Sequence, residues 1–382
     1  MHYYDFAGYC QMLTDERRMK AYSETMKKVI GKDSIVLDLG AGTGYFSILA
    51  SKLGAKKVYA LEPNSLIDLA KEFAKQNNCP DNIEFIQKTS TDFVLEEKAD
   101  VLICDLHGVF PFFDASIETI IDARKRLIKP DAVMLPRKET VFFAVVETTD
   151  MYDKNISQFL KEMDGISIAS AKHLLTNRLM NGYQKEMSLL SDAKVFAELD
   201  YRMVEETSFS KILNFEINKK GFAHGLRGWF ECEIGDGLFT TNSPENLETV
   251  YGAPFLPFEN ILEVDSGDSF EVKLDAVFEK GEYLWHWAVK ILDKDKNVKA
   301  GFAQSTMTGA FIAPKVLLKQ SEYFVPKPNS DAEIDGFILG KMDGENMQGD
   351  IADGLLEKFP AKFADFEQAL QRVSQLSQKY TD

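Results

Sequence analysis

The chain has 382 residues, of which 44 are Lys or Arg and 60 are Asp or Glu, giving a formal net charge of −16. A hydrophobic fraction of 45% and a charged fraction of 27% are typical of a globular protein of two or three domains and exclude a disordered acidic chain. The acidity argues against a general nucleic-acid binder, because phosphate contacts require clustered Lys and Arg. No apolar run approaches the length of a membrane span. Neither nucleic acid nor a membrane is therefore expected as a partner.

The cysteines and the N-terminus indicate the compartment. The spacing of the cysteines contains no CxxC pair and predicts neither a disulfide framework nor a thiolate metal site; they are Cys10, Cys79, Cys104 and Cys232. The opening residues lack the basic-then-apolar order of a signal peptide. We expect a cytoplasmic protein with no bound metal.

The first 138 residues predict N-terminal helices followed by a doubly wound α/β domain. After N-terminal helices in residues 1–30, with an amphipathic pattern over 12–30, strands and helices alternate through residues 31–138. This alternation is typical of a doubly wound, Rossmann-like parallel sheet. The expected strands are Ser34–Leu39, Lys57–Leu61, Ile83–Gln87 and Val101–Asp105, and the expected helices are Tyr45–Lys52 and Ser65–Gln76.

The rest of the chain changes character twice. Short β-rich runs separated by turn residues occupy residues 139–318 and predict an antiparallel barrel, interrupted by a helical arm at about 155–185. Trp285 and Trp287 alternate to one face there and are expected in the barrel core. Residues 319–382 predict a small helical tail, with helices over Asp331–Met342, Met347–Phe359 and Phe363–Tyr380.

A glycine motif carries the sharpest chemical signal. Asp38 precedes Gly40, Gly42 and Gly44 at a strand-to-helix turn, and Glu62 closes the next strand. Glycines at such a turn allow positive φ and a close approach of ligand to backbone. A carboxylate beside the turn suits an ammonium group better than a phosphate, and Glu62 is placed to bind a ribose diol. The motif predicts a site for S-adenosyl-L-methionine.

The chain also resembles the protein arginine methyltransferases over roughly residues 1–315. The matching segments are Met12–Arg18, the loop from Asp105 to Asp114, Ala123–Leu127, Lys129-Pro130 and Met134–Pro136. The resemblance implies that Arg18 meets the carboxylate of the methyl donor, that Ser90 and Thr91 lie near its adenine, and that Asp105 and Asp114 bind a guanidinium. It further implies a β-barrel acceptor domain and a homodimer formed through the arm.

Several positions depart from the family pattern. The family has glutamates where this chain has Asp105 and Asp114, and a methionine where it has His107. The Thr-His-Trp loop of the barrel is replaced by Thr249–Tyr251, without its histidine. The N-terminal aromatic motif is only partly matched, by Tyr3, Tyr4 and Tyr9.

These departures leave three hypotheses open. Two aspartates still suit a guanidino or other nitrogen acceptor in a peptide, a protein or a small molecule. A non-guanidine acceptor is the second hypothesis, with His107 as the general base. A non-catalytic binding scaffold is the third. For the first, loss of the Asp105 carboxylate is expected to remove turnover while leaving donor binding largely intact.

The tail and the charge distribution add two further indications. Residues 337–344 and 350–360 resemble the helix-turn-helix core of small winged-helix modules, among them peptide-docking domains. The net charge is −2 over residues 1–139, −10 over 140–314 and −4 over 315–382. The concentration of negative charge in the barrel and arm favours a cationic acceptor.

Overall fold

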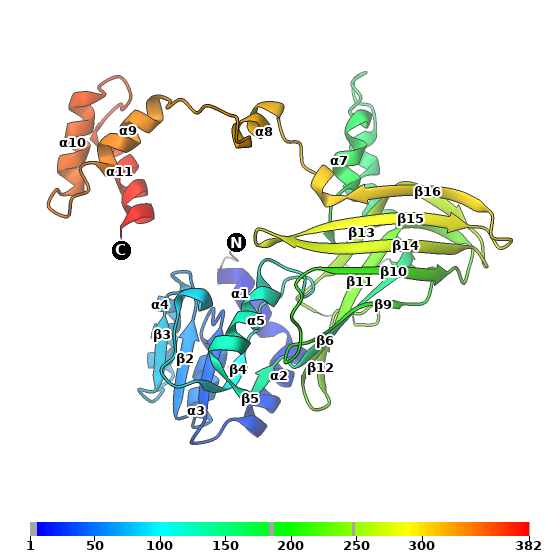
Figure 1. The fold of residues 1–382 in the computed structure, drawn as a ribbon, viewed down its shortest axis with the longest axis horizontal. Helices are drawn as coiled ribbons and strands as arrows, with labels where there is room; N and C mark the ends of the chain where they lie inside the picture. The colour runs from blue at the N-terminus through cyan, green and yellow to red at the C-terminus, as the bar shows by residue number, and fades with distance from the viewer. Residues whose placement is uncertain (1–5, 183–186, 247–248, 382) are drawn as a thin grey trace. The chain divides into compact units, whose positions relative to one another are not determined.

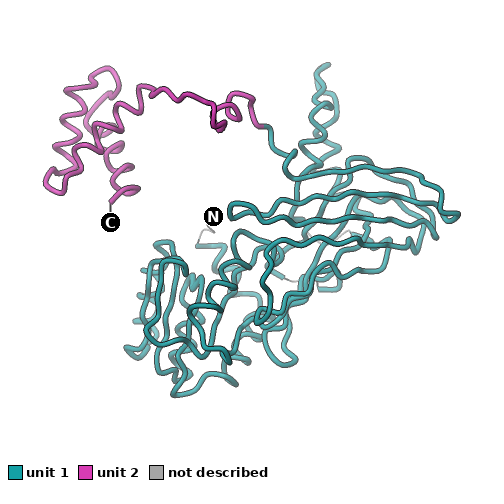
Figure 2. The backbone as a smooth tube through the Cα atoms, viewed as in Figure 1, with its two compact units in different colours: residues 1–311 teal, residues 312–382 magenta. Residues whose placement is uncertain are grey.

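A computed structural model describes residues 6–182, 187–246 and 249–381. The chain forms two compact units, residues 1–311 and residues 312–382 (Figure 2), and each is described by itself. Tyr3 and Tyr4, two tyrosines of the N-terminal aromatic pattern, lie outside the described residues.

The N-terminal segment forms two helices where the sequence predicted one pattern over residues 12–30. They are α1 (Phe6–Thr14) and α2 (Glu16–Val29). Asp15 separates them because its backbone is extended, with φ −74° and ψ 90°, and its side chain accepts the Arg18 backbone N–H at 3.0 Å. Such an N-cap satisfies a donor that the first helical turn leaves unpaired. The cap fixes where α2 begins and places Arg18 in its first turn.

A five-stranded parallel sheet follows, with the strand order β3-β2-β1-β4-β5 (Figure 1). The strands are β1 (Ile35–Leu39), β2 (Lys57–Leu61), β3 (Ile83–Ile86), β4 (Ala99–Ile103) and β5 (Ile128–Leu135); the helices are α3 (Tyr45–Lys52), α4 (Leu66–Gln76), the short η1 (Ser90–Asp92) and α5 (Ser116–Arg126). All five residues of β1 are buried, as expected for a strand covered on both faces. The predicted doubly wound sheet is confirmed.

The order of the strands locates a binding site. Strands β1 and β4 are neighbours, but the chain leaves β1 toward β2 and leaves β4 toward β5. Ligands of open α/β sheets bind beyond the carboxyl ends of the strands at such a switch point. The glycine turn follows β1 and Asp105 follows β4, so both lie there.

The predicted antiparallel region is also confirmed and consists of two sheets. One sheet has the strand order β10-β14-β15-β16. The other has the order β7-β13-β11-β6-β8, and in it β12 also pairs with β11 and β9 with β6. The strands are β6 (Lys138–Glu147), β7 (Met180–Gly182), β8 (Ser188–Leu189), β9 (Lys194–Asp200), β10 (Phe209–Glu216), β11 (Gly221–Gly235), β12 (Leu238–Thr241), β13 (Ala253–Val264), β14 (Ser269–Glu279), β15 (Glu282–Leu292) and β16 (Val298–Ser305). Trp285 and Trp287 are buried in the core as expected.

Short elements interrupt these sheets where a helical arm was predicted. They are α6 (Thr149–Asn155), η2 (Ser157–Leu160), η3 (Ala169–Ala171) and α7 (Lys172–Thr176). Tyr152 anchors α6 by donating from its hydroxyl to the Phe258 carbonyl at 2.8 Å. The end of the predicted arm, residues 183–185, lies outside the described residues.

The second unit is a helical bundle. After η4 (Thr306–Thr308) at the end of the first unit, the chain forms α8 (Pro314–Gln320), α9 (Ser330–Leu339), α10 (Gln348–Lys358) and α11 (Phe366–Tyr380). Ile338, Leu355 and Val373, one from each of the last three helices, are fully buried against one another. No strand occurs in residues 312–381, so the described part of the tail has helices but no β-wing. Among the described residues, no helix is long and apolar enough to cross a membrane.

Candidate active site

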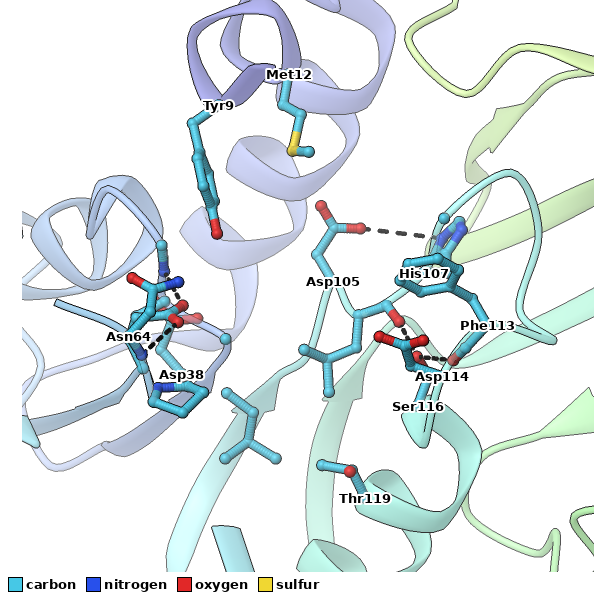
Figure 3. A pocket seen from close by; sticks show the side chains of 18 of the residues that line it. Tyr9, Met12, Asp38, Asn64, Asp105, His107, Phe113, Asp114, Ser116 and Thr119 are labelled. Carbon is cyan, nitrogen blue, oxygen red and sulfur yellow. Dashed lines mark hydrogen bonds and ion pairs between the residues drawn. The ribbon is translucent and has the colours of Figure 1, made fainter. Parts of the chain in front are cut away.

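A cavity of about 580 Å³ lies at the carboxyl ends of the parallel strands (Figure 3). This is an ordinary volume for a small-molecule site. The cavity brings together ten of the eleven residues singled out from the sequence, which are Arg18, Asp38, Gly40, Gly42, Glu62, Ser90, Thr91, Asp105, His107 and Asp114. Gly44 is the exception, since it does not line the cavity.

The glycine turn needs glycine for two different reasons. Gly40, Gly42 and Gly44 have φ of 69°, 52° and 73°, which side chains rarely adopt. A Cβ on Gly42 would also lie 2.8 Å from the Tyr9 ring at the cavity wall. A Cβ on Gly44 would instead lie 2.8 Å from the Cβ of Ala70 in α4. Gly44 therefore allows α3 and α4 to pack closely, whereas Gly40 and Gly42 form the cavity surface.

Glu62 holds the glycine turn from the end of β2. Its Oε2 accepts the Gly42 backbone N–H at 3.0 Å, and its Oε1 accepts the Asn64 backbone N–H at 3.2 Å. Burial raises the pKa of Glu62, while these two N–H donors oppose the rise. The carboxylate is thus fixed in orientation at the cavity wall, and each oxygen keeps a lone pair for a ligand hydroxyl.

Asp38 is buried at the end of β1. Its Oδ2 accepts the Ser47 hydroxyl at 2.6 Å. Burial raises the pKa of Asp38 to about 7, although the Ser47 hydrogen bond opposes that rise and Glu62 adds to it. The carboxyl group is therefore poised to change charge near neutrality.

Ser90 and Thr91 begin the short helix η1 after β3 and line the cavity. The Arg126 guanidinium donates to the Ser90 carbonyl at 2.8 Å, which ties this segment to α5. The hydroxyl oxygens of Thr89 and Thr91 lie 2.8 Å apart. The segment presents small polar groups to the cavity.

Arg18 and Asp105 form a buried ion pair. The Arg18 Nε and Nη2 both donate to Oδ2 of Asp105, the former at 2.6 Å, while Nη1 donates to the Met12 carbonyl at 2.9 Å. The side chains are only 7% and 11% exposed. Burial by itself would raise the pKa of Asp105, but Arg18 holds it below its ordinary value. Oδ1 accepts the Tyr22 hydroxyl at 3.2 Å and retains capacity for a further donor.

Asp114 lies on the loop between β4 and α5. Its backbone is left-handed, with φ 42°, and its side chain is half-buried. The Ser116 hydroxyl braces the loop by donating to the Leu106 and Phe113 carbonyls, the latter at 2.7 Å. Figure 3 shows Asp114 beside Ser116 and Phe113, while the Asp105 carboxylate lies between Met12 and His107. Both predicted acceptor carboxylates therefore line the cavity.

His107 is enclosed in the cavity wall, with a side chain only 4% exposed. Its Nε2 lies 3.9 Å from Oδ1 of Asp105 and 3.7 Å from Oε1 of Glu139. Its ring stacks on Tyr251, with the centroids 4.9 Å apart and the planes at 5°. Tyr251 is the last residue of Thr249–Tyr251, the segment compared above with a Thr-His-Trp loop, and it supplies an aromatic face to the imidazole.

Several residues that line the cavity were not among those identified from the sequence. Tyr9 was noted only as part of an N-terminal pattern, and Asn64, Thr119 and Asn181 were not identified; all four line the cavity. Asn64 could have been inferred from its place two residues after Glu62. Asn181 comes from β7 in the barrel region and has no local motif that would have identified it.

The family model and the relatives that this chain matches are all described as methyltransferases. The family model described as ribosomal protein L11 methyltransferase (PrmA) matches residues 20–134. Protein arginine N-methyltransferase 2 of Dictyostelium discoideum is 28% identical over 231 residues, covering 58% of this chain and 45% of that protein. Protein arginine N-methyltransferase 1 of Chlamydomonas reinhardtii is 25% identical over 281 residues, covering 72% of this chain and 81% of that protein.

Two solved structures share the fold. The Trypanosoma brucei protein arginine methyltransferase 1 enzyme-prozyme heterotetrameric complex with AdoHcy has a TM-score of 0.71 at 21% identity and covers 79% of this chain and 98% of that chain. Arabidopsis thaliana protein arginine methyltransferase 10 has a TM-score of 0.68 at 22% identity, with coverage of 79% and 97%. The chain therefore has the fold of the protein arginine methyltransferases and is similar to them in sequence.

Proposed function

We propose that the protein transfers a methyl group from S-adenosyl-L-methionine to a guanidine nitrogen of arginine. The excess of acidic side chains lining the cavity favours cationic ligands. Five carboxylate residues line it, namely Asp38, Glu62, Asp105, Asp114 and Glu118, against the two basic residues Arg18 and Lys88. The donor carries a sulfonium and an ammonium, and the acceptor carries a guanidinium, so all three charges suit such a lining.

The residues at the strand ends fit the parts of the donor. Gly40 and Gly42 leave room for close approach, Asp38 suits its ammonium, and Glu62 suits its ribose hydroxyls. Ser90 and Thr91 are assigned to the adenine end and Arg18 to the carboxylate. The donor supplies an electrophilic methyl group on sulfur; this chain's residues bind it and orient it toward the wall that carries Asp105 and Asp114.

The guanidine assignment rests on the hydrogen bonds of the Asp105 carboxylate. It already binds a guanidinium, that of Arg18, through Oδ2 alone, and leaves Oδ1 directed toward His107 and Tyr22. An acceptor guanidinium hydrogen-bonded to Asp105 Oδ1 and to Asp114 would be held in a fixed orientation. The nitrogen lone pair then attacks the methyl carbon as the carbon–sulfur bond breaks, and the methylated guanidinium releases one proton.

The position of His107 favours this assignment over a His107 general base. The imidazole is almost fully enclosed between two carboxylates. A general base must come within about 3.2 Å of the proton that it removes, whereas His107 meets the cavity only at its wall. We assign His107 to positioning of Asp105.

The proposal is tested by incubating the full chain with labelled donor and three acceptors: an arginine-rich peptide, the same peptide with lysine for arginine, and free arginine. Mass spectrometry should detect added methyl groups on arginine in the first or third reaction. The guanidine assignment would be overturned if the lysine peptide were methylated as fast as the arginine peptide. It would also be overturned if protein that binds the donor methylated none of the three acceptors.

Donor binding should depend on pH through Asp38. Because the folded pKa of this carboxyl is about 7, it is protonated in the empty protein below that pH. A bound ammonium requires the ionised form, so binding releases a proton there. We expect donor affinity to fall by up to about tenfold per pH unit below about pH 7 and to level off above it.

Calorimetry with AdoHcy measures this dependence. The Asp38→Asn variant is the matched control, because an amide cannot ionise and its weaker binding should vary little with pH. Affinity of the unsubstituted protein that stays constant between about pH 5.5 and about pH 7 would contradict the assignment of Asp38 to the ammonium.

The arm and the thiols support two further parts of the proposal. Apolar side chains on the arm are strongly exposed, and a second copy of the chain would cover them; they are Phe159, Met163, Ile166 and Ile168. We therefore assign the arm to homodimer formation. The four cysteines have free thiols, which fits a reducing compartment such as the cytoplasm.

The tail is proposed to dock the acceptor protein. The second unit has its own cavity of about 420 Å³, and its lining has both apolar and charged side chains, among them Phe337, Ile351, Lys341, Lys358, Asp350 and Glu357. A chain truncated after Phe311 removes this unit. Turnover on a short arginine peptide should be unchanged, while kcat/KM on a long protein acceptor should fall at least about tenfold, because a tethered docking site raises local substrate concentration. Equal kcat/KM for both chains on the long acceptor would contradict docking.

A further inference from the structure

Three side chains that are far apart in the sequence meet behind the cavity wall. His107 follows β4, Glu139 is on β6 and Cys232 is on β11. One nitrogen, oxygen or sulfur atom from each lies within 4.8 Å of the others. Glu139 and Cys232 are fully buried, and His107 is nearly so.

Several buried polar atoms in this cluster lack a hydrogen bond to the described residues. Both nitrogens of His107, Oε2 of Glu139 and the Tyr251 hydroxyl are buried, and among the described residues none has a hydrogen bond. The Tyr201 hydroxyl donates to Glu139 Oε1 at 2.8 Å, and the Cys232 thiol also interacts with the Glu139 carboxylate. Buried polar atoms are nearly always satisfied, and several such atoms in one place indicate a bound species.

We propose that His107, Glu139 and Cys232 bind a zinc ion. A thiolate, an imidazole and a carboxylate are the donor types that Zn²⁺ takes in proteins, and the sulfur selects against Mg²⁺ and Ca²⁺. With bonds of about 2.0–2.3 Å, tetrahedral ligands lie roughly 3.5 Å apart. The three atoms must therefore close by roughly 1 Å from their present separation.

The charges of the site balance. Zinc with one thiolate, one carboxylate and one neutral imidazole has no net charge, and binding releases the thiol proton of Cys232. His107 also lines the cavity, so water from that side would complete a four-coordinate site. No local motif marks this site, because its ligands are separated by 32 and 93 positions.

The site would join the acceptor loop to the barrel. His107 is two residues from Asp105, while Glu139 and Cys232 face each other as paired residues of β6 and β11. A metal bonded to all three would fix the loop against those strands. This inference does not depend on the proposed methyl transfer.

Titration of the full, metal-stripped chain with Co²⁺, and competition with Zn²⁺, test the proposal. We expect one metal per chain and a thiolate-to-cobalt charge-transfer band. Cys232→Ser should abolish that band. Cys104→Ser is the matched control, because that buried thiol contacts the Leu135 carbonyl at 3.6 Å and is not a proposed ligand.

Glu139→Gln provides a second variant. Since groups that only support metal ligands contribute about 10–100-fold in affinity, loss of a direct ligand should weaken Zn²⁺ binding at least about tenfold. Circular dichroism and AdoHcy binding confirm that each variant is folded. The absence of a thiolate band in the unsubstituted chain, or an equal band in Cys232→Ser, would overturn the site, the latter showing adventitious binding at another cysteine.

Discussion

Asp105→Asn is expected to lower methyl transfer by about 10²–10³-fold, because the variant loses the charge that orients the acceptor. The same change should lower the free energy of unfolding by about 3–5 kcal/mol, since it leaves the Arg18 guanidinium buried without a counter-ion. Arg18 is also the residue assigned to the donor carboxylate. Donor affinity should therefore change as well, which differs from the expectation formed from the sequence.

Asp100→Asn is the control for this prediction. Asp100 lies on β4, the strand that Asp105 follows, and pairs with Lys129 at 2.7 Å, but both side chains are about one-third exposed. Breaking an exposed ion pair costs about 1 kcal/mol or less, and turnover should be unaffected. Activity assays, calorimetry with AdoHcy and urea unfolding provide the three readouts. Full turnover by Asp105→Asn would place the acceptor elsewhere.

Gly42→Val is expected to weaken donor binding at least about a hundredfold, equivalent to about 2.8 kcal/mol. A side chain at φ 52° is strained, and its Cβ would overlap the Tyr9 ring at the cavity wall. The branched side chain would then occupy space assigned to the donor. Calorimetric titration with AdoHcy measures the loss directly.

Gly54→Val separates backbone strain from obstruction of the cavity. Gly54 has φ 91°, but a Cβ there would meet no atom within 4 Å. It should cost stability of about 1–2 kcal/mol through the backbone and leave donor affinity unchanged. Equal donor binding by Gly42→Val and the unsubstituted protein would show that the glycine turn does not contact the donor.

The parallel sheet was predictable because its signals are local. The apolar run at β1, the glycines after it and Glu62 after β2 occur in short, regular order. The long strand β13 has no clear strand pattern in the sequence, because Pro254 and Pro257 interrupt it and proline is unusual inside a strand. The break at Asp15 was missed because the apolar spacing continues across it, while the cap that begins α2 depends on one side chain.

Some parts of the site could likewise be predicted from local sequence, whereas others depend on tertiary packing. Residues at strand ends, such as Asp38 and Asp105, reach the cavity wherever the sheet forms, so sequence position predicts their location. The pairing of Arg18 with Asp105 joins residues 87 positions apart and depends on how α2 packs against the sheet. The surroundings of His107 depend on strands of the barrel, and no local pattern specifies which side chains those strands bring to it.

The Arg18–Asp105 ion pair has a thermodynamic consequence for the proposed reaction. One residue of the pair is assigned to each substrate, so the two substrates share a hydrogen-bond network. A donor carboxylate that draws Arg18 away from Asp105 frees an oxygen for the acceptor. By linkage, whatever factor the donor applies to acceptor affinity, the acceptor must apply equally to donor affinity. Binding of the two substrates is then cooperative without any movement of the surrounding sheet.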